Sequence, residues 1–161
     1  MKRLLIITLV ILMAFLTACS GADETPESEI PDNNTQSAEE DSEMASIIMR
    51  INNEEVMVTW ENNESVKALA ELASESPLVI DTSMYGGFEQ VGSIGTTLPS
   101  SDVNTTTKPG DIVLYTGSNI VVFYGSNSWD YTMLGHIENK STDELKSLLG
   151  GNNVTITLTA E

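Results

Sequence analysis

Aromatic and small residues gather in the second half of the chain in a pattern that suits ligand binding. Seven aromatic residues fall within 47 positions: Tyr85, Phe88, Tyr115, Phe123, Tyr124, Trp129 and Tyr131. Tyrosine and tryptophan combine an apolar ring with a polar tip, so they are suited to the walls of a shallow pocket. We therefore predict a binding groove formed by Tyr85, Gly86, Gly87, Phe88, Tyr124, Trp129 and Tyr131. The alternative is that these side chains only fill the interior of the fold.

The local sequence indicates how the groove would be assembled. Gly125-Ser126-Asn127-Ser128 has the composition of a turn. A strand after this turn would place Trp129 and Tyr131 on one face and Asp130 on the other. Gly86 and Gly87 permit a sharp turn and leave room for the backbone of a ligand to approach.

The sequence contains few of the residues that catalysis or metal binding would need. His136 is the only histidine, and no nucleophile-elbow motif surrounds Ser83 or Ser126, although Asp130 is available as an acid. One histidine and one cysteine cannot form a zinc site, and no calcium-binding loop is present. We expect no catalytic residue, metal or cofactor, and we interpret His136 as a strand residue, with a hydrolase as the weakest alternative.

The first residues have the pattern of a secretory signal. Lys2 and Arg3 precede an apolar run of 13 residues, 4–16, which is shorter than the ~20 residues that span a bilayer. The following "LTAC" resembles the lipobox of bacterial lipoproteins, in which the signal is cut before an acylated cysteine. This resemblance implies a signal peptide at 1–18, lipidation of Cys19 and an extracytoplasmic protein anchored to a bacterial membrane. An ordinary signal peptide with a chance cysteine is the alternative.

Two segments of different composition follow the signal. Residues 20–43 hold nine acidic residues and no basic ones, with Ile30 as their single large apolar residue. Such a segment cannot bury enough apolar surface to fold, so we predict that residues 19–44 form a lipidated, disordered tether. The remaining domain, residues 45–161, carries a net charge of −10. Nucleic acid is therefore excluded as a partner, since so acidic a surface repels phosphates.

The domain itself is predicted to be mainly β. Period-two patterns indicate strand hairpins at 47–60 and 111–124 and a final strand at 154–158. Val66, Leu69, Ala70 and Ala73 repeat at helical spacing after Asn62 or Asn63, and a second helix opens at Ser141 with Glu144 as its capping-box partner. The fold that best accommodates these elements is a closed β-barrel of about eight strands, capped by two short helices.

Four motifs extend this interpretation to a family. "YGGFEQVG", "KPGDIVLY", "IVVFYGSNSWDYTMLG" and the opening hairpin and helix resemble the bacterial cyclophilin-like domain family. The resemblance implies a cyclophilin-type barrel without a settled activity. We therefore expect a ligand- or protein-binding module for an unknown peptide, protein or small molecule.

Prolyl isomerisation is the alternative function, because true cyclophilins are prolyl isomerases. Their catalytic face carries a Phe-His-Arg stretch, which is not found here. Arg50, the one arginine after the signal peptide, lies in the first predicted strand. Enzyme activity is accordingly not expected, and a divergent isomerase acting on extracytoplasmic peptides is the second choice.

Overall fold

The structure is a computed structural model and describes residues 46–161. The predicted signal peptide, Cys19 and the tether up to residue 44 lie outside the described residues. Within residues 46–161, no helix is long and apolar enough to cross a membrane.

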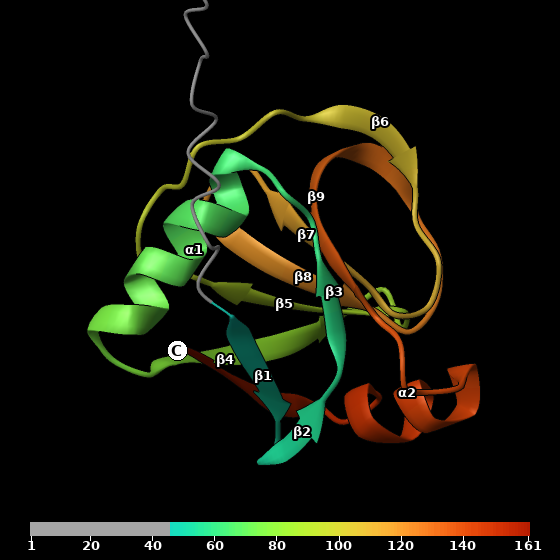
Figure 1. The fold of residues 1–161 in the computed structure, drawn as a ribbon. Helices are drawn as coiled ribbons and strands as arrows, with labels where there is room; N and C mark the ends of the chain where they lie inside the picture. The colour runs from blue at the N-terminus through green and yellow to red at the C-terminus, as the bar shows by residue number, and fades with distance from the viewer. Residues whose placement is uncertain (1–45) are drawn as a thin grey trace, which may run out of the picture. The chain divides into compact units, whose positions relative to one another are not determined.

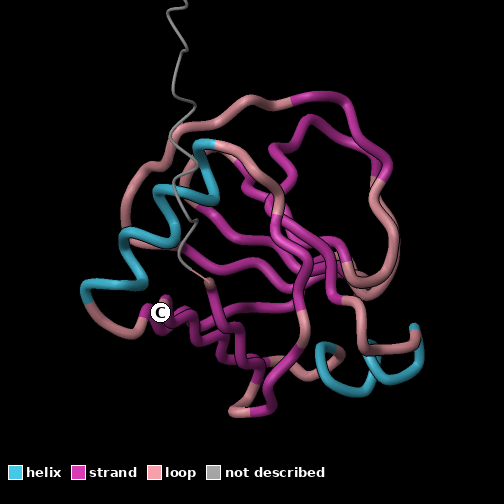
Figure 2. Tube along the Cα trace, in the orientation of Figure 1, coloured by secondary structure: helices cyan, strands magenta, loops and turns pink. Residues whose placement is uncertain are grey.

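Ten strands and two helices make up the domain (Figures 1 and 2). In chain order they are β1 (Ile47–Ile51), β2 (Glu54–Val56), β3 (Val58–Trp60), α1 (Glu64–Glu75), β4 (Leu78–Tyr85), β5 (Glu89–Ser93), β6 (Val103–Thr106), β7 (Asp111–Tyr115), β8 (Asn119–Phe123), β9 (Ser128–Ile137), α2 (Thr142–Leu149) and β10 (Asn153–Ala160). The described part is therefore mainly β, as predicted.

The strands form a nearly closed antiparallel barrel. Their order is β2-β1-β10-β4-β5-β8-β7-β9-β3, with β6 paired only to β9. The two ends of this path, β2 and β3, are successive parts of one chain segment that is interrupted only at Met57. Counted as one strand, they bring the ring to eight members, which confirms the predicted barrel. The first strand β1 also lies beside the last strand β10, with Ile47 opposite Ala160.

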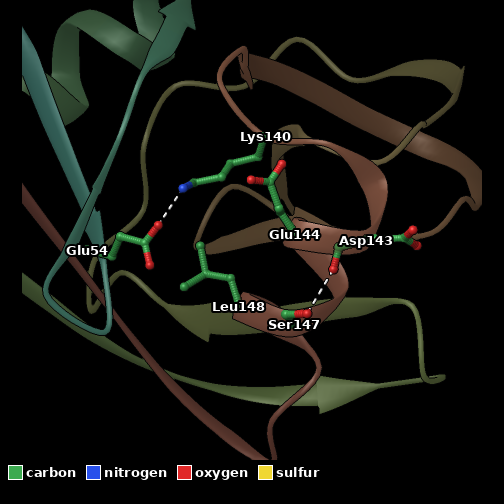
Figure 3. Close-up of a pocket in the computed structure, with 6 residues that line it drawn as sticks. All are labelled: Glu54, Lys140, Asp143, Glu144, Ser147 and Leu148. Atoms are coloured by element: carbon green, nitrogen blue, oxygen red, sulfur yellow. Dashed lines mark hydrogen bonds and ion pairs between the residues drawn. The ribbon is translucent and has the colours of Figure 1, made fainter.

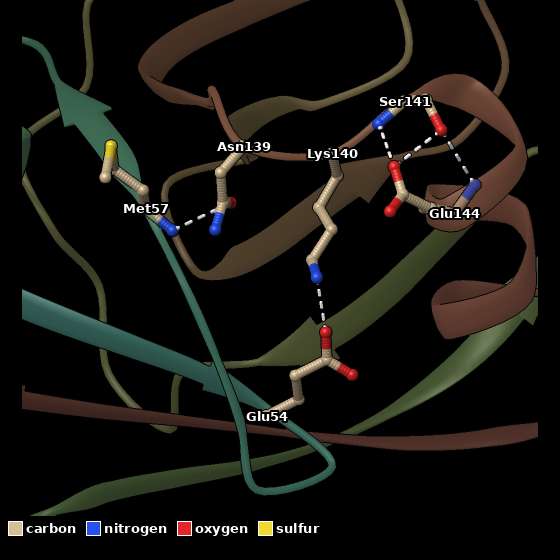
Figure 4. A network of polar contacts seen from close by, with 6 residues as sticks. All are labelled: Glu54, Met57, Asn139, Lys140, Ser141 and Glu144. Atoms are coloured by element: carbon tan, nitrogen blue, oxygen red, sulfur yellow. Dashed lines mark hydrogen bonds and ion pairs between the residues drawn. The ribbon is translucent and has the colours of Figure 1, made fainter.

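The interruption at Met57 is bonded to the segment between β9 and α2. The Met57 N–H donates to Oδ1 of Asn139 over 3.0 Å (Figure 4). The Met57 carbonyl accepts from the N–H of Glu138 over 2.9 Å. We call this junction between Met57 and residues 138–139 the seam of the barrel. Beside it, the Lys140 ammonium pairs with the Glu54 carboxylate. Within this segment β2 pairs with β1, and β3 pairs with β9. At the change of partner, both backbone groups of Met57 still form hydrogen bonds.

Local sequence rules explain the hairpin turn and the helix starts. Asn52 and Asn53 adopt φ of 50° and 68°, the left-handed values that a tight hairpin turn requires. Oδ1 of Asn63 accepts from the N–H of Val66 over 3.0 Å and so caps α1. Ser141 and Glu144 form the predicted capping box of α2 (Figure 4). In Figures 1 and 2 the two helices lie on opposite sides of the strands.

Two apolar clusters occupy the two faces of the barrel wall. The larger one fills the interior and includes Leu69 of α1, Leu145 of α2 and Ile156 of β10. The smaller one lies on the outer face of β7, β8 and β9 and consists of Val113, Val121, Phe123 and Tyr131. Strands buried on both faces have unbroken apolar runs in their sequence, which accounts for "IVVF" in β8.

Candidate binding pocket

A pocket of about 620 Å³ opens on the outer face of the barrel, over the smaller cluster. Five aromatic side chains line it: Tyr85, Phe88, Tyr115, Trp129 and Tyr131. The other lining residues are Glu89, Val91, Val121 and Asn127. The volume is within the range of small-molecule sites.

The floor of the pocket is formed by side chains that alternate between the two faces of β5 and β8. Glu89 and Val91 of β5 are paired in register with Phe123 and Val121 of β8, so these four side chains share the outer face. Gln90, between them, points into the interior opposite Val122. The floor therefore consists of apolar side chains and one carboxyl group.

The turn between β4 and β5 places Tyr85 and Phe88 at one side of the pocket. Gly86 and Gly87 adopt φ of 61° and 77°, a region in which residues with a Cβ are strained. A Cβ at Gly86 would stand 2.2 Å from Cε1 of Phe88, so the ring position depends on this glycine. Tyr85 remains 67% exposed, which leaves its ring at the mouth of the pocket.

The turn before β9 is fixed by the buried Thr107. The hydroxyl of Ser126 donates to the Thr107 carbonyl over 2.6 Å, and the Asn127 N–H donates to Oγ1 of Thr107 over 3.0 Å. Asn127 in turn donates from Nδ2 to the Tyr131 phenol oxygen over 3.0 Å. The turn thus orients Tyr131, whose own O–H remains available as a donor.

Tyr131 and Trp129 occupy different depths of the same face. Tyr131 is buried and makes edge-on contacts with Tyr115 and Phe123, with ring centroids 6.0 and 5.7 Å apart. Trp129 is 57% exposed. Tyr131 therefore belongs to the floor, and Trp129 forms part of the rim.

Glu89 is the exceptional group of the pocket. The residue is 5% exposed, and its Oε2 is the one buried side-chain oxygen or nitrogen within residues 46–161 that has no hydrogen-bond partner. The neighbouring Gln90 shows the usual arrangement: its Nε2 donates to the Leu149 and Gly151 carbonyls, and its Oε1 accepts from Thr82. Burying an unpaired polar atom costs about 1–3 kcal/mol, so Glu89 is a poor choice for stability alone.

Burial also changes the protonation of the pocket. Desolvation raises the pKa of Glu89 from 4.5 to about 7. Desolvation likewise raises the pKa of Tyr131, with a smaller contribution from the Glu89 charge, while the hydrogen bond from Asn127 opposes the increase. The pocket therefore holds a carboxyl group that titrates near neutral pH beside a phenol, Tyr131, whose pKa is raised.

The structure brings together four of the predicted binding residues: Tyr85, Phe88, Trp129 and Tyr131. Gly86 and Gly87 shape the turn and are not lining residues. Tyr124 lies elsewhere, in the interior cluster, because alternation along the chain sends Phe123 outward and Tyr124 inward. Sequence reasoning missed the other five lining residues, among them Tyr115 and Glu89. The available signal for Glu89 was a lone acidic residue at the start of the strand "EQVGS".

His136 lies outside this pocket. Its Nδ1 is 2.7 Å from Oδ1 of the buried Asp111, whose Oδ2 accepts from the Lys108 N–H over 2.8 Å. Ser126 and Asp130 bond to Thr107 and Asn104 instead, and Ser83 is on β4. The predicted role of His136 as a strand residue agrees with its place in β9. Within residues 46–161, no cluster of three or more histidine, cysteine or acidic residues could hold a metal ion.

A second, shallower pocket of about 410 Å³ lies between α2 and the β2 end of the barrel (Figure 3). It is lined by Glu54, Lys140, Asp143, Glu144, Ser147 and Leu148. Lys140 pairs with Glu54, and Glu144 bonds to Ser141. The first pair stabilises the seam and the second bond caps the start of α2, so Lys140, Glu54 and Glu144 have structural roles.

The sequence comparison decides the family. The model of the cyclophilin-like family matches residues 49–159. The chain belongs to the cyclophilin-like family. This match covers the barrel from β1 to β10 and confirms the resemblance seen in the four motifs.

One solved structure to which the chain is similar is the solution structure of the hypothetical protein AF2241 from Archaeoglobus fulgidus. It is 19% identical, covers 73% of this cyclophilin-like chain and 96% of its own, and has a TM-score of 0.49. No curated protein matches the chain significantly.

Proposed function

We propose that this cyclophilin-like protein is an extracytoplasmic lipoprotein, anchored to a bacterial membrane through Cys19, whose barrel binds a ligand in the outer pocket. The observation that carries the binding role is the pocket itself. It combines an aromatic wall, an accessible tryptophan and a buried carboxyl group without a partner on one face of the barrel. Sites of this kind, mostly apolar with a few placed polar groups, are where small ligands bind.

A screen of small molecules against the ¹⁵N-labelled full chain tests the proposal. The two tryptophans give two indole N–H resonances, and the Trp60 indole N–H donates to the Ile47 carbonyl inside the fold over 2.9 Å. A ligand of the pocket should shift the Trp129 resonance and leave that of Trp60 in place.

Two variants make the screen specific. Trp129→Ala lacks the indole readout, so binding to both variants is followed through the backbone amide resonances of β5 and β9. Trp129→Ala should weaken the binding of any ligand found. Val79→Ala should not, because Val79 is 61% exposed on β4 and does not line the pocket. Hits that bind both variants equally, or a screen without any hit at Trp129, would count against a binding role for this pocket.

Prolyl isomerisation is the weaker candidate. The resemblance implies an arginine that polarises the prolyl amide, and Arg50 instead pairs with Glu55 over 2.7 Å on the β1–β2 hairpin. None of the nine residues that line the outer pocket is an arginine.

A further inference from the structure

We propose that the outer pocket binds an organic ammonium ion, with Glu89 as its counter-ion and hydrogen-bond acceptor. This inference rests on the proposed ligand-binding function and specifies the chemical class of the ligand. It starts from the unpaired Oε2 of Glu89, a buried acceptor that a bound donor would satisfy.

The charges around Glu89 favour a cation. The nine lining residues include no lysine, arginine or histidine, so the pocket contains no positive group to balance the carboxylate. The titratable groups that line it with Glu89 are phenols: Tyr85 from β4, Tyr115 from β7 and Tyr131 from β9. Desolvation raises the pKa of Tyr124, which follows β8, and the Glu89 charge raises it further. The domain as a whole is acidic, which attracts cations and repels anions.

The aromatic wall favours the same class of ligand. The face of an aromatic ring carries partial negative charge, and rings that surround an ammonium group attract it in addition to packing against its carbon atoms. Tyr85 and Trp129 are exposed at the mouth, so a ligand can contact them while its charged end lies near Glu89. An apolar body with one ammonium group matches this distribution.

The unpaired oxygen distinguishes between types of ammonium ion. Oε2 requires a hydrogen-bond donor, which a primary or secondary ammonium supplies and a quaternary one does not. A charge-assisted N–H···O bond is shorter and stronger than a neutral one. The geometry therefore assigns the site to an ammonium ion that carries N–H groups.

Binding of a cation should also release a proton. Glu89 has a pKa of about 7 in the free protein, so below neutral pH the carboxyl group is mainly protonated and must lose its proton to pair with an ammonium. The affinity for the cation should therefore be about tenfold weaker at pH 6 than at pH 8, while a neutral ligand should show no such decrease.

Three probes of similar shape test the assignment: benzylammonium, benzyl alcohol and benzyltrimethylammonium. Each is titrated into the ¹⁵N-labelled full chain at pH 6 and pH 8, with the Trp129 indole resonance as the readout and that of Trp60 as the internal reference. We expect benzylammonium to bind about tenfold to a hundredfold tighter than benzyl alcohol at pH 8. We expect benzyltrimethylammonium to bind between the two, because it has the charge without the N–H donor.

Glu89→Gln supplies the variant test, since it removes the charge and keeps the shape. It should bind benzylammonium and benzyl alcohol with similar affinity and lose the pH dependence. Glu71→Gln, an exposed carboxylate on α1, is the matched control and should behave as the wild type. The pH series on the wild-type protein also tests whether binding depends on the ionised Glu89. The proposal can therefore be refuted even if the variant does not fold.

The outcomes separate this inference from the proposed function. Equal affinity for benzylammonium and benzyl alcohol would overturn the ammonium assignment and leave a ligand-binding pocket. Tighter binding of benzyl alcohol at pH 6 would point to a protonated Glu89 that donates a hydrogen bond, which also contradicts the assignment. If none of the three probes shifts the Trp129 resonance, the assignment fails, and the wider screen decides whether the pocket binds ligands at all.

Discussion

Replacing Glu89 by glutamine should change how the stability of the protein depends on pH. Burial raises the pKa of Glu89 from 4.5 to about 7 in the folded state. A carboxyl group whose folded-state pKa is raised binds more protons in the folded than in the unfolded chain over this interval. The contribution of Glu89 to stability is therefore fully present below about pH 4.5 and is lost as the pH rises through 7.

The size of this loss follows from the difference between the two pKa values. A difference of one between the folded and unfolded pKa corresponds to about 1.4 kcal/mol. A rise from 4.5 to about 7 therefore gives a loss of about 3 kcal/mol in the free energy of unfolding. The glutamine amide is neutral at every pH used. Any cost of its own unpaired groups is constant with pH, so the variant should lack this particular decrease.

Urea unfolding of the full chain at pH 4.5, 6, 7 and 8.5 measures the effect. The difference in unfolding free energy between Glu89→Gln and the wild type should grow by about 3 kcal/mol across the series. Glu71→Gln, with the same change of charge on an exposed helix position, should show no such growth. A difference that stays constant within about 0.5 kcal/mol from pH 4.5 to 8.5 would show that the Glu89 carboxyl group is not desolvated as described.

The other predictions concern the pocket rim, the barrel seam, the anchor and catalysis. Trp129→Ala should cost less than about 1.5 kcal/mol in urea unfolding, because the side chain is 57% exposed, and a loss of about 3–5 kcal/mol would show that it packs as a core residue. Asn139→Ala should cost about 1 kcal/mol in the same assay, since it removes the acceptor of the Met57 N–H; an unchanged midpoint would mean that water replaces it fully. Cys19→Ser should move the protein from the membrane fraction to the soluble one on cell fractionation, and continued membrane association would contradict the lipobox assignment. In a prolyl-peptide assay the protein should not accelerate cis/trans exchange; a rate above background that falls in Arg50→Ala would reverse that expectation.

Local signals in the sequence predicted the framework of the fold. The capping box at Ser141 and the left-handed turn at Asn52 depend on contacts between near neighbours in the chain, which residue types specify directly. The apolar spacing of α1 likewise depends on its own periodicity. These elements, with the family resemblance, were sufficient to predict the barrel.

The site was harder to predict, because it depends on which face of a strand looks outward. "IVVF" in β8 is apolar on both faces, so its pattern does not say whether Phe123 or Tyr124 points into the barrel. The placement of Tyr124 in the groove failed to match the structure for this reason. Glu89 raised the same difficulty, since only the pairing of β5 with β8 shows that it shares a face with the aromatic residues.

The pairing of β1 with β10 has a consequence for how the protein acquires its fold. Synthesis proceeds from β1 to β10, yet β10 lies between β1 and β4 and bonds to both. A nascent chain that lacks the last strand leaves two neighbouring edges unpaired, and unpaired edges are prone to pairing with other chains. The barrel therefore cannot close progressively from its first strand onward. Its closure needs residues 153–160, so a chain shortened at this end would lose the strand that joins β1 to β4.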